Sequence, residues 1–274
     1  MGIRTIFNVA EDCARGERTG WAEFVRDFAG IGRTLLTHYF PSLGAKPDEL
    51  VVAVFQRAES NQRAWFAGLS FTNEREFMMA FRSLVFSYAR ERLKAQPANA
   101  QGSSACVTAE QSLASMKDLL LLEREVLWLL IKGYDAPRIA ATMMNAAATA
   151  ESVERVAGER LRLLFPGVAP EQRSGFAAAL LEMAEGLNTE SCVSLKSFNN
   201  LVNGQITWRE REAAEQHMSN CLYCIDRFTS FQEMVRLRKD TPPLAPPQVQ
   251  AILAQLQLAP AKSRGVLSRL LAGR

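Results

Sequence analysis

Apolar residues recur at helical spacing along almost the whole chain. In most segments they return every three or four positions, the period that places them on one face of an α-helix. No stretch shows the sustained alternation of apolar and polar residues, bounded by turn signals, that indicates a half-buried β-strand. The pattern therefore predicts an all-α protein.

Breaks in composition divide these helical segments into six parts. Small, polar, glycine- and proline-containing stretches mark the boundaries, because such residues favour turns and linkers. The predicted parts are an aromatic- and arginine-rich helical domain (20–95), a linker (96–111), a second helical domain (112–168), a connecting helix (171–188), a domain containing cysteine and histidine (190–237), and a proline-rich linker with a basic amphipathic tail (238–274).

Three of the five cysteines and one of the two histidines gather in the fifth part: Cys192, His217, Cys221 and Cys224. His217 and Cys221 have the i, i+4 spacing that on a helix places two side chains on one face. The two-residue gap between Cys221 and Cys224 lets both thiolates reach one tetrahedral ion from a helix end. Cys192 would return beside them on an antiparallel helix.

The segment between these residues supports a helix, a turn and a second helix. Gly204 follows an apolar helical segment and is expected at the C′ position, where a left-handed backbone favours glycine. Thr207 would then be the N-cap of the next helix, and Glu210 would complete a capping box. This arrangement would bring Cys192 to the other three residues.

We therefore predict that Cys192, His217, Cys221 and Cys224 bind one Zn²⁺ ion. Four nitrogen and sulfur ligands make a closed site, which favours a structural or sensing ion over a catalytic one. The alternative is that the cysteines are small buried apolar residues and His217 lies on the surface, since free cysteines are often buried for packing alone. That alternative explains the spacing poorly.

Composition narrows the classes of function. Apolar residues make up 48% of the chain and charged residues 22%, as in soluble globular proteins, and the net charge of +3 means that any basic, nucleic-acid-binding face must be local. No apolar run approaches the ~20 residues of a membrane span, and charge comes too early for a signal peptide. We expect a cytoplasmic protein without membrane attachment.

His38 lies in an apolar helical context and no phosphate-binding loop or nucleophile elbow occurs, so an enzyme is not expected. Cys13 and Cys106 lie in polar segments and are treated as incidental.

The pattern of Cys192, the turn at 201–206 and His217-x-x-x-Cys221-x-x-Cys224 resembles the zinc-binding anti-sigma fold. Members of that family carry a cysteine or histidine, a Leu-x-x-Gly-x-Leu turn, and then His-x-x-x-Cys-x-x-Cys. All four ligand positions match. The preceding parts of the chain can therefore be compared with sigma factors, the subunits that direct RNA polymerase to promoters.

Residues 22–95 resemble the sigma-factor domain that binds the polymerase clamp and opens the −10 element. Within it, residues 46–57 look like the polymerase-contacting helix, in which an acidic pair leads into an apolar stripe. The resemblance implies that the following residues bind core RNA polymerase: Asp48, Glu49, Leu50, Val54 and Phe55.

Residues 77–94 resemble the promoter-recognition helix of the same domain. Interleaved basic and aromatic side chains suit single-stranded DNA, because cations neutralise phosphates and rings stack on unpaired bases. The alternative is a surface helix with a phenylalanine-rich core face. The family usually has Trp, Asn and Asp where this chain has Ala80, Ser87 and Glu91. The residues expected to contact DNA are Arg82, Tyr88, Arg90, Arg92 and Lys94.

Residues 112–168 resemble the helix-turn-helix domain that recognises the −35 element, with the turn at 145–149 and the recognition helix at 151–164. Basic residues are expected on such a helix because it faces closely spaced phosphates. Three glutamates bring its formal charge to zero, and two of them stand where the family usually has basic residues. We therefore expect the helix-turn-helix shape more than strong major-groove binding. The candidate DNA-contacting residues are Arg155, Arg160 and Arg162, against Glu151, Glu154 and Glu159.

The leading hypothesis is an extracytoplasmic-function-type sigma factor with a fused C-terminal zinc domain. The resemblance implies binding to core RNA polymerase and promoter DNA, under the control of a metal- or redox-sensing domain. The alternative is an interaction protein on the same fold that does not recognise DNA and binds polymerase, or a separate sigma or anti-sigma partner. The neutral recognition helix favours this alternative.

Overall fold

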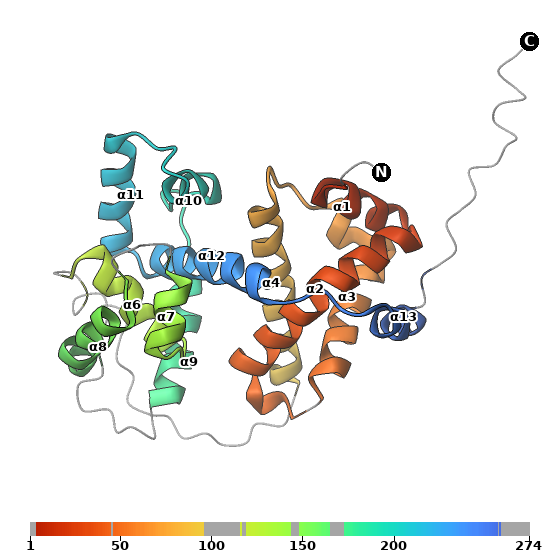
Figure 1. Ribbon diagram of the computed structural model, residues 1–274, viewed down its shortest axis with the longest axis horizontal. Helices are drawn as coiled ribbons and strands as arrows, with labels where there is room; N and C mark the ends of the chain where they lie inside the picture. Colours follow the sequence, from red (N-terminus) through yellow and green to blue (C-terminus); the bar gives the residue numbers. More distant parts are fainter. Residues whose placement is uncertain are drawn as a thin grey trace, which may run out of the picture. The chain divides into compact units, whose positions relative to one another are not determined.

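Every regular element in the described part of the chain is a helix, which confirms the predicted all-α class (Figure 1). The described residues form two compact units, one of Met1–Gln96 with Asp240–Arg274 and one of Pro97–Lys239. The computed structural model describes residues 4–44, 46–95, 116, 119–143, 148–164, 173–256 and 258. Within these ranges, only the backbone is described for residues 61, 62, 160–164 and 173–179.

The first unit is a helical bundle around an aromatic core. Phe24 lies at its centre, and its ring centroid is 5.1 Å from the rings of both Phe55 and Phe66 and 5.3 Å from that of Phe28. Edge-to-face contacts between such rings add to the free energy of burying them. The bundle contains α1 (Ile6–Arg15), α2 (Arg18–Tyr39), the 3₁₀ turn η1 (Pro41–Leu43), α3 (Pro47–Ala67), α4 (Glu74–Lys94) and α13 (Pro246–Gln255).

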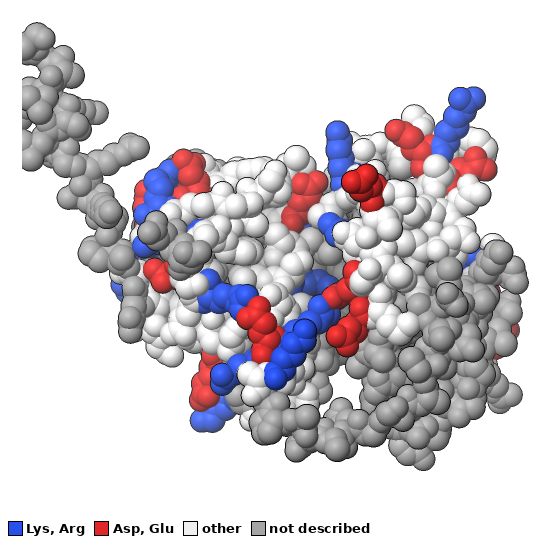
Figure 2. Space-filling view, turned by 180° about the vertical axis from the view of Figure 1, so that it is seen from behind, with Lys and Arg blue, Asp and Glu red and all other residues white. Residues whose placement is uncertain are grey.

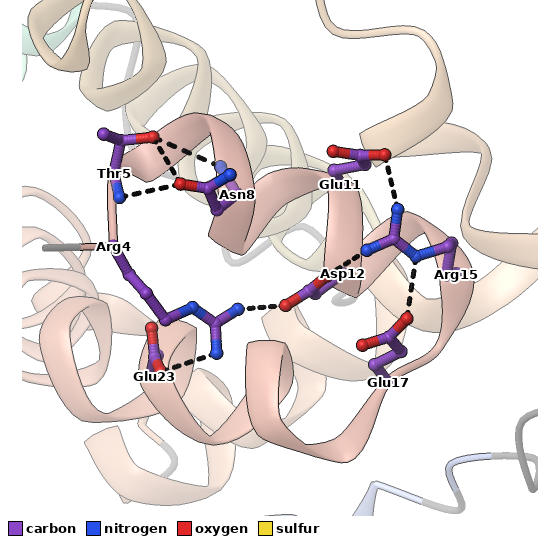
Figure 3. Close-up of polar contacts among 8 residues, drawn as sticks. All are labelled: Arg4, Thr5, Asn8, Glu11, Asp12, Arg15, Glu17 and Glu23. Carbon is purple, nitrogen blue, oxygen red and sulfur yellow. Dashed lines mark hydrogen bonds and ion pairs between the residues drawn. The ribbon is translucent and has the colours of Figure 1, made fainter. Parts of the chain in front are cut away.

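Helix α1 precedes the expected start of this domain at residue 20. Thr5 caps it in a capping box with Asn8, and Gly16 ends it in the left-handed conformation at φ 76°. Ion pairs then hold α1 to its neighbours (Figure 3). Arg4 pairs with Asp12 and, at 2.9 Å, with Glu23 of α2. Cys13, which the sequence placed in a polar segment, is fully buried.

The chain returns to the first unit after residue 239. The Leu244 amide donates to the Arg26 carbonyl oxygen at 2.8 Å, and Gln56 Nε2 donates to the Gln255 carbonyl oxygen at 3.1 Å. A Cβ at Gly30 would lie 2.5 Å from Thr241 Cγ2, so the absence of a side chain there allows α2 and the returning segment to approach closely. The described part of the expected terminal linker is therefore packed against α2 and α3; the basic amphipathic tail lies outside the described residues. The apolar residues that α13 and its end bury are Val249, Leu253 and Leu256.

In the second unit, α6 lies between two apolar cores. Val126 and Leu129 face α7 and α8 in one core, and Leu127 and Trp128 face α9 and the start of α12 in the other. The expected division into a helical domain, a connecting helix and a metal domain therefore differs from the structure, in which all three share a core through α6. Segments of that size bury more apolar surface together than separately. The helices are α6 (Leu121–Ile131), α7 (Ala136–Thr142), α8 (Ala150–Leu164), α9 (Arg173–Gly186), α10 (Leu195–Val202), α11 (Trp208–Asn220) and α12 (Leu222–Asp240).

Candidate metal centre

The structure brings Cys192, His217, Cys221 and Cys224 together, and we call these four residues the candidate metal centre. Their ligand atoms all lie within 4.8 Å of one another. The sulfur atoms of Cys192 and Cys221 are 3.9 Å apart. Two thiolates bound to one tetrahedral Zn²⁺ at the usual bond length would be about 3.8 Å apart. The geometry is therefore that of a site that could hold one metal ion.

The backbone positions these ligands in a way that differs from the expected one. Helix α11 ends at Asn220, and Cys221 has an extended backbone at φ −132° and ψ 110°. His217 and Cys221 thus meet across a break between two helices, and do not share the face of one. Cys192 lies in the turn before α10 and not on a helix. The break lets the chain turn back, so that Cys224 in the first turn of α12 reaches the same point.

The turn between α10 and α11 follows the prediction. Gly204 has the left-handed φ of 67°. Thr207 is the N-cap of α11, and its side chain and that of Glu210 form the capping box. These contacts satisfy backbone N–H groups that the first turn of a helix leaves unpaired. They fix where α11 begins, and so help to set the position of His217.

Main-chain groups around the sulfur atoms favour thiolates. The Val193 amide donates a hydrogen bond to Cys224 Sγ at 3.3 Å, and the Thr189 amide donates to Cys192 Sγ at 3.4 Å. Such contacts from outside the ligand set orient metal ligands and stabilise their charged form. The pKa of Cys221 is lowered to about 5, mainly because the Cys224 thiol donates a hydrogen bond to it. The thiol that supplies this proton, Cys224, has its pKa raised by the same bond and by burial.

His217 supplies an independent test of whether the residues fit a metal. Its Nε2 atom is buried and has no hydrogen-bond partner among the described residues. A buried imidazole nitrogen without a partner is unfavourable, because it loses its contact with water and gains nothing in return. A bound ion at the candidate metal centre would provide a partner for the imidazole. The donor set of three sulfur atoms and one imidazole is also that of structural zinc sites.

The structure separates the residues expected to bind polymerase into two groups. Asp48 and Glu49 are exposed in the first turn of α3, where their charge interacts favourably with the helix N-terminus. Leu50, Val54 and Phe55 are buried in the core of the first unit. Their assignment as contact residues is therefore corrected, because these side chains lie inside the first unit, where Phe55 packs against Phe24 of α2 and Phe81 of α4.

A similar correction applies to one residue of the expected DNA-binding helix. Arg82 is only 7% exposed, and its Cζ lies 3.9 Å from the centroid of the Phe86 ring, a cation–π contact inside the first unit. The same helix exposes Arg92 and Lys94 near its C-terminal end, whereas Tyr88 and Arg90 are half-buried. Arg82 therefore cannot reach DNA in this conformation.

The exposed face of α8 is more acidic than basic in its described part. Glu151, Glu154, Arg155 and Glu159 are exposed, and Arg155 lies 3.8 Å from Glu159. The side chains of Arg160 and Arg162 lie outside the described residues. On the molecular face in Figure 2, basic side chains stand next to acidic ones and do not form an extended basic area.

Sequence reasoning missed a set of buried polar residues between α6 and α12. Lys132 is fully buried beside Asp226, and Gln232 Nε2 donates to Glu125 Oε2 at 3.0 Å. The only signal in the sequence is that these polar residues stand within or next to apolar runs.

Comparison of the chain with the models of known protein families, with curated proteins and with solved structures gave no match. Within the described residues, no helix combines the length and apolar character that crossing a membrane requires.

Proposed function

We propose that this chain is a cytoplasmic, sigma-factor-like regulator of transcription initiation, controlled by Zn²⁺ at the candidate metal centre. The proposal rests on one observation above all. The helix that carries Cys224, α12, continues directly into the core that it shares with α6, the first helix of the helix-turn-helix-like α6–α8 block. The state of the candidate metal centre can therefore affect the part of the chain that resembles a promoter-binding domain.

The ligand set favours zinc, because thiolate and imidazole ligands in a closed four-coordinate site suit this ion. Zn²⁺ would supply a cross-link between the turn at Cys192, helix α11 and the start of α12. Oxidation of the thiolates, or competition by another soft metal, would remove that cross-link. Local folding that depends on the ion would then be lost, and the packing of α12 would change.

The proposed contact with core RNA polymerase involves the exposed acidic pair Asp48 and Glu49 at the start of α3. Arg33 Nε donates to Asp48 Oδ1 at 2.7 Å, which orients this carboxylate at the surface. Exposed charges of this kind contribute more to orientation and association rate than to affinity.

A second candidate function is an interaction protein that binds polymerase, or a separate sigma or anti-sigma partner, without recognising promoter DNA. Two observations favour it. Arg82 is buried, and the described exposed side chains of α8 carry three carboxylates and one guanidinium. Over its whole length α8 is formally neutral, so its charge provides no net attraction to the phosphates of the major groove.

The test uses the purified full-length chain. Its metal content is measured first, and one zinc per chain is expected. Binding to core RNA polymerase is then measured with and without a thiol oxidant, for the wild type and for a Cys221→Ser, Cys224→Ser double variant. A polymerase affinity that is identical in all of these conditions would reject metal control. Formation of a specific open complex on promoter DNA by the reconstituted holoenzyme would reject the interaction-only candidate.

A further inference from the structure

The turn of α12 that follows Cys224 is anchored to α6 by a buried acid. Asp226 Oδ1 accepts a hydrogen bond from Trp128 Nε1 at 2.9 Å and lies 3.0 Å from Lys132 Nζ. Its position two residues after Cys224 places this contact within the same helical turn as a metal ligand. The anchor therefore restrains the part of the backbone that must present Cys224 to the ion.

Lys132 completes the anchor from the α6 side. Its side chain is fully buried, and Nζ donates to the Asp226 carbonyl oxygen at 3.1 Å and to the hydroxyls of Thr229 and Ser230 at 2.8 Å each. All of these acceptors belong to α12. A buried ammonium group is stable only when such partners satisfy it. Separation of α12 from α6 would therefore remove these contacts together, as one event.

Apolar contacts link the metal ligands to this docking of α12 on α6. Leu222, between Cys221 and Cys224, and Ile225, directly after Cys224, are each 1% exposed in the core that also contains Trp128. Ser219, two residues before Cys221, accepts a hydrogen bond from Arg124 of α6. The ligand turn is thus held against α6 on both sides of Cys221 and Cys224.

From these contacts we infer that Lys132, Trp128 and Asp226 are positioning residues that couple metal affinity to the docking of α12 on α6. The ion binds the docked turn, because only there are Cys221 and Cys224 held beside Cys192 and His217. An α6 substitution that disfavours docking lowers the fraction of chains able to bind, and the apparent dissociation constant rises by the same factor. By reciprocity, the factor by which docking raises the affinity for the ion is also the factor by which the ion favours docking.

This coupling rests on the metal site of the proposed function but not on any role in transcription. It assigns to Lys132, the buried C-cap residue of α6, a role that an apolar residue would not have. A lysine can be hydrated when α12 leaves and is satisfied when α12 returns, so the contact is reversible. The candidate metal centre and the α6–α8 block then behave as two linked sites.

The experiment is a titration of the full-length, reduced chain with Co²⁺, whose absorption reports tetrahedral thiolate coordination. The variants are Trp128→Phe in α6 and Lys132→Met at the C-cap of α6, and neither changes α12. The control is Lys196→Met, which alters an exposed lysine of α10 four residues after the ligand Cys192. We expect Lys132→Met to weaken Co²⁺ binding about tenfold or more and Trp128→Phe to weaken it less, with Lys196→Met unchanged.

A second control separates coupling from a general loss of stability. Tyr134→Phe removes the hydrogen bond from Tyr134, which follows α6, to Glu233, farther along α12 from Cys224. If both α6 variants lower the melting temperature as Tyr134→Phe does, but weaken Co²⁺ binding more, coupling is supported. If Co²⁺ affinity follows melting temperature alone across all variants, the inference is overturned.

Hydrogen exchange of the α6 amides gives the reciprocal measurement. We expect protection of α6 to fall when the metal is removed from the wild type and to depend less on the metal in Lys132→Met. Should Lys132→Met fail to fold, an affinity of Trp128→Phe equal to that of the wild type overturns the inference. A wild-type chain that binds no Co²⁺ would instead overturn the metal site itself, which distinguishes failure of the proposed function from failure of the coupling.

Discussion

Replacement of the buried carboxyl group of Glu125 should change the pH dependence of stability in the second unit. Glu125 lies on α6, is 6% exposed, and accepts a hydrogen bond from Gln232. Burial raises its pKa to about 7, and the neighbouring Glu215 adds to the shift. Gln232 Oε1 is buried without a partner among the described residues. The site therefore favours a neutral group, so that Glu125→Gln is a conservative change.

The sign follows from the direction of the shift. A carboxyl group whose pKa is higher in the folded than in the unfolded chain contributes most stability below its unfolded pKa. That contribution is lost as the pH rises through the folded pKa. The shift is from 4.5 to about 7. At 1.36 kcal/mol per unit it corresponds to about 3 kcal/mol once the group is ionised in both states. Integrated between pH 5.5 and 8.0, about 2 kcal/mol of this is lost. Glutamine has no such ionisation.

The assay is urea unfolding at several pH values in saturating zinc, with pulse-labelled hydrogen exchange of α6 peptides to report on the second unit alone. The quantity of interest is the free energy of unfolding of Glu125→Gln minus that of the wild type, because the pH dependence of metal binding cancels in this difference. We expect the difference to rise with pH by about 2 kcal/mol between pH 5.5 and 8.0.

Glu212→Gln, on the exposed surface of α11, is the matched control and should show no such rise. A difference for Glu125→Gln that stays constant from pH 5.5 to 8.0 would refute the reasoning. It would mean that the folded protein holds Glu125 ionised throughout this range, and that the contacts around it compensate for its burial.

Three further predictions follow from the packing. Gly30→Ala would place a Cβ 2.5 Å from Thr241 and should make the segment after residue 240 more sensitive to proteolysis. Gly158→Ala, where a Cβ would meet nothing within 4 Å, should stabilise α8 by about 0.5–1 kcal/mol in chemical unfolding. Phe55→Ala should destabilise the first unit by about 3–5 kcal/mol, while Asp48→Asn should leave the melting temperature of this unit nearly unchanged in calorimetry. A variant that keeps the wild-type melting temperature can then be used to test polymerase binding. Cys224→Ser should abolish stoichiometric zinc in elemental analysis and lower the melting temperature of the second unit, because metal-binding free energy contributes to folding.

The helical class and the ligand set could be predicted because both depend on local patterns. The helical period and the capping signals at Gly204, Thr207 and Glu210 act over a few residues, and the structure contains them where expected. The spacing of Cys221 and Cys224 likewise limits which chemistry the side chains can perform. The path of the backbone between His217 and Cys221 was less accessible, because an i, i+4 spacing fits both a continuous helix and the break that occurs at Cys221.

Burial and long-range partners were decided by the tertiary structure alone. An apolar stripe such as Leu50, Val54 and Phe55 has the same sequence whether it meets a partner protein or the core of its own unit. Arg82 is of a residue type that often contacts DNA, but in the structure its side chain packs on the ring of Phe86.

The same holds for α13 and for Lys132. The apolar residues of α13 find their place against α2 and α3 only because the chain returns to the first unit. Lys132 is stable in the interior only because Asp226, far along the chain, arrives beside it. The free energy of burying a side chain depends on what it meets, and the helical period identifies the face of a helix but not the surface that covers it.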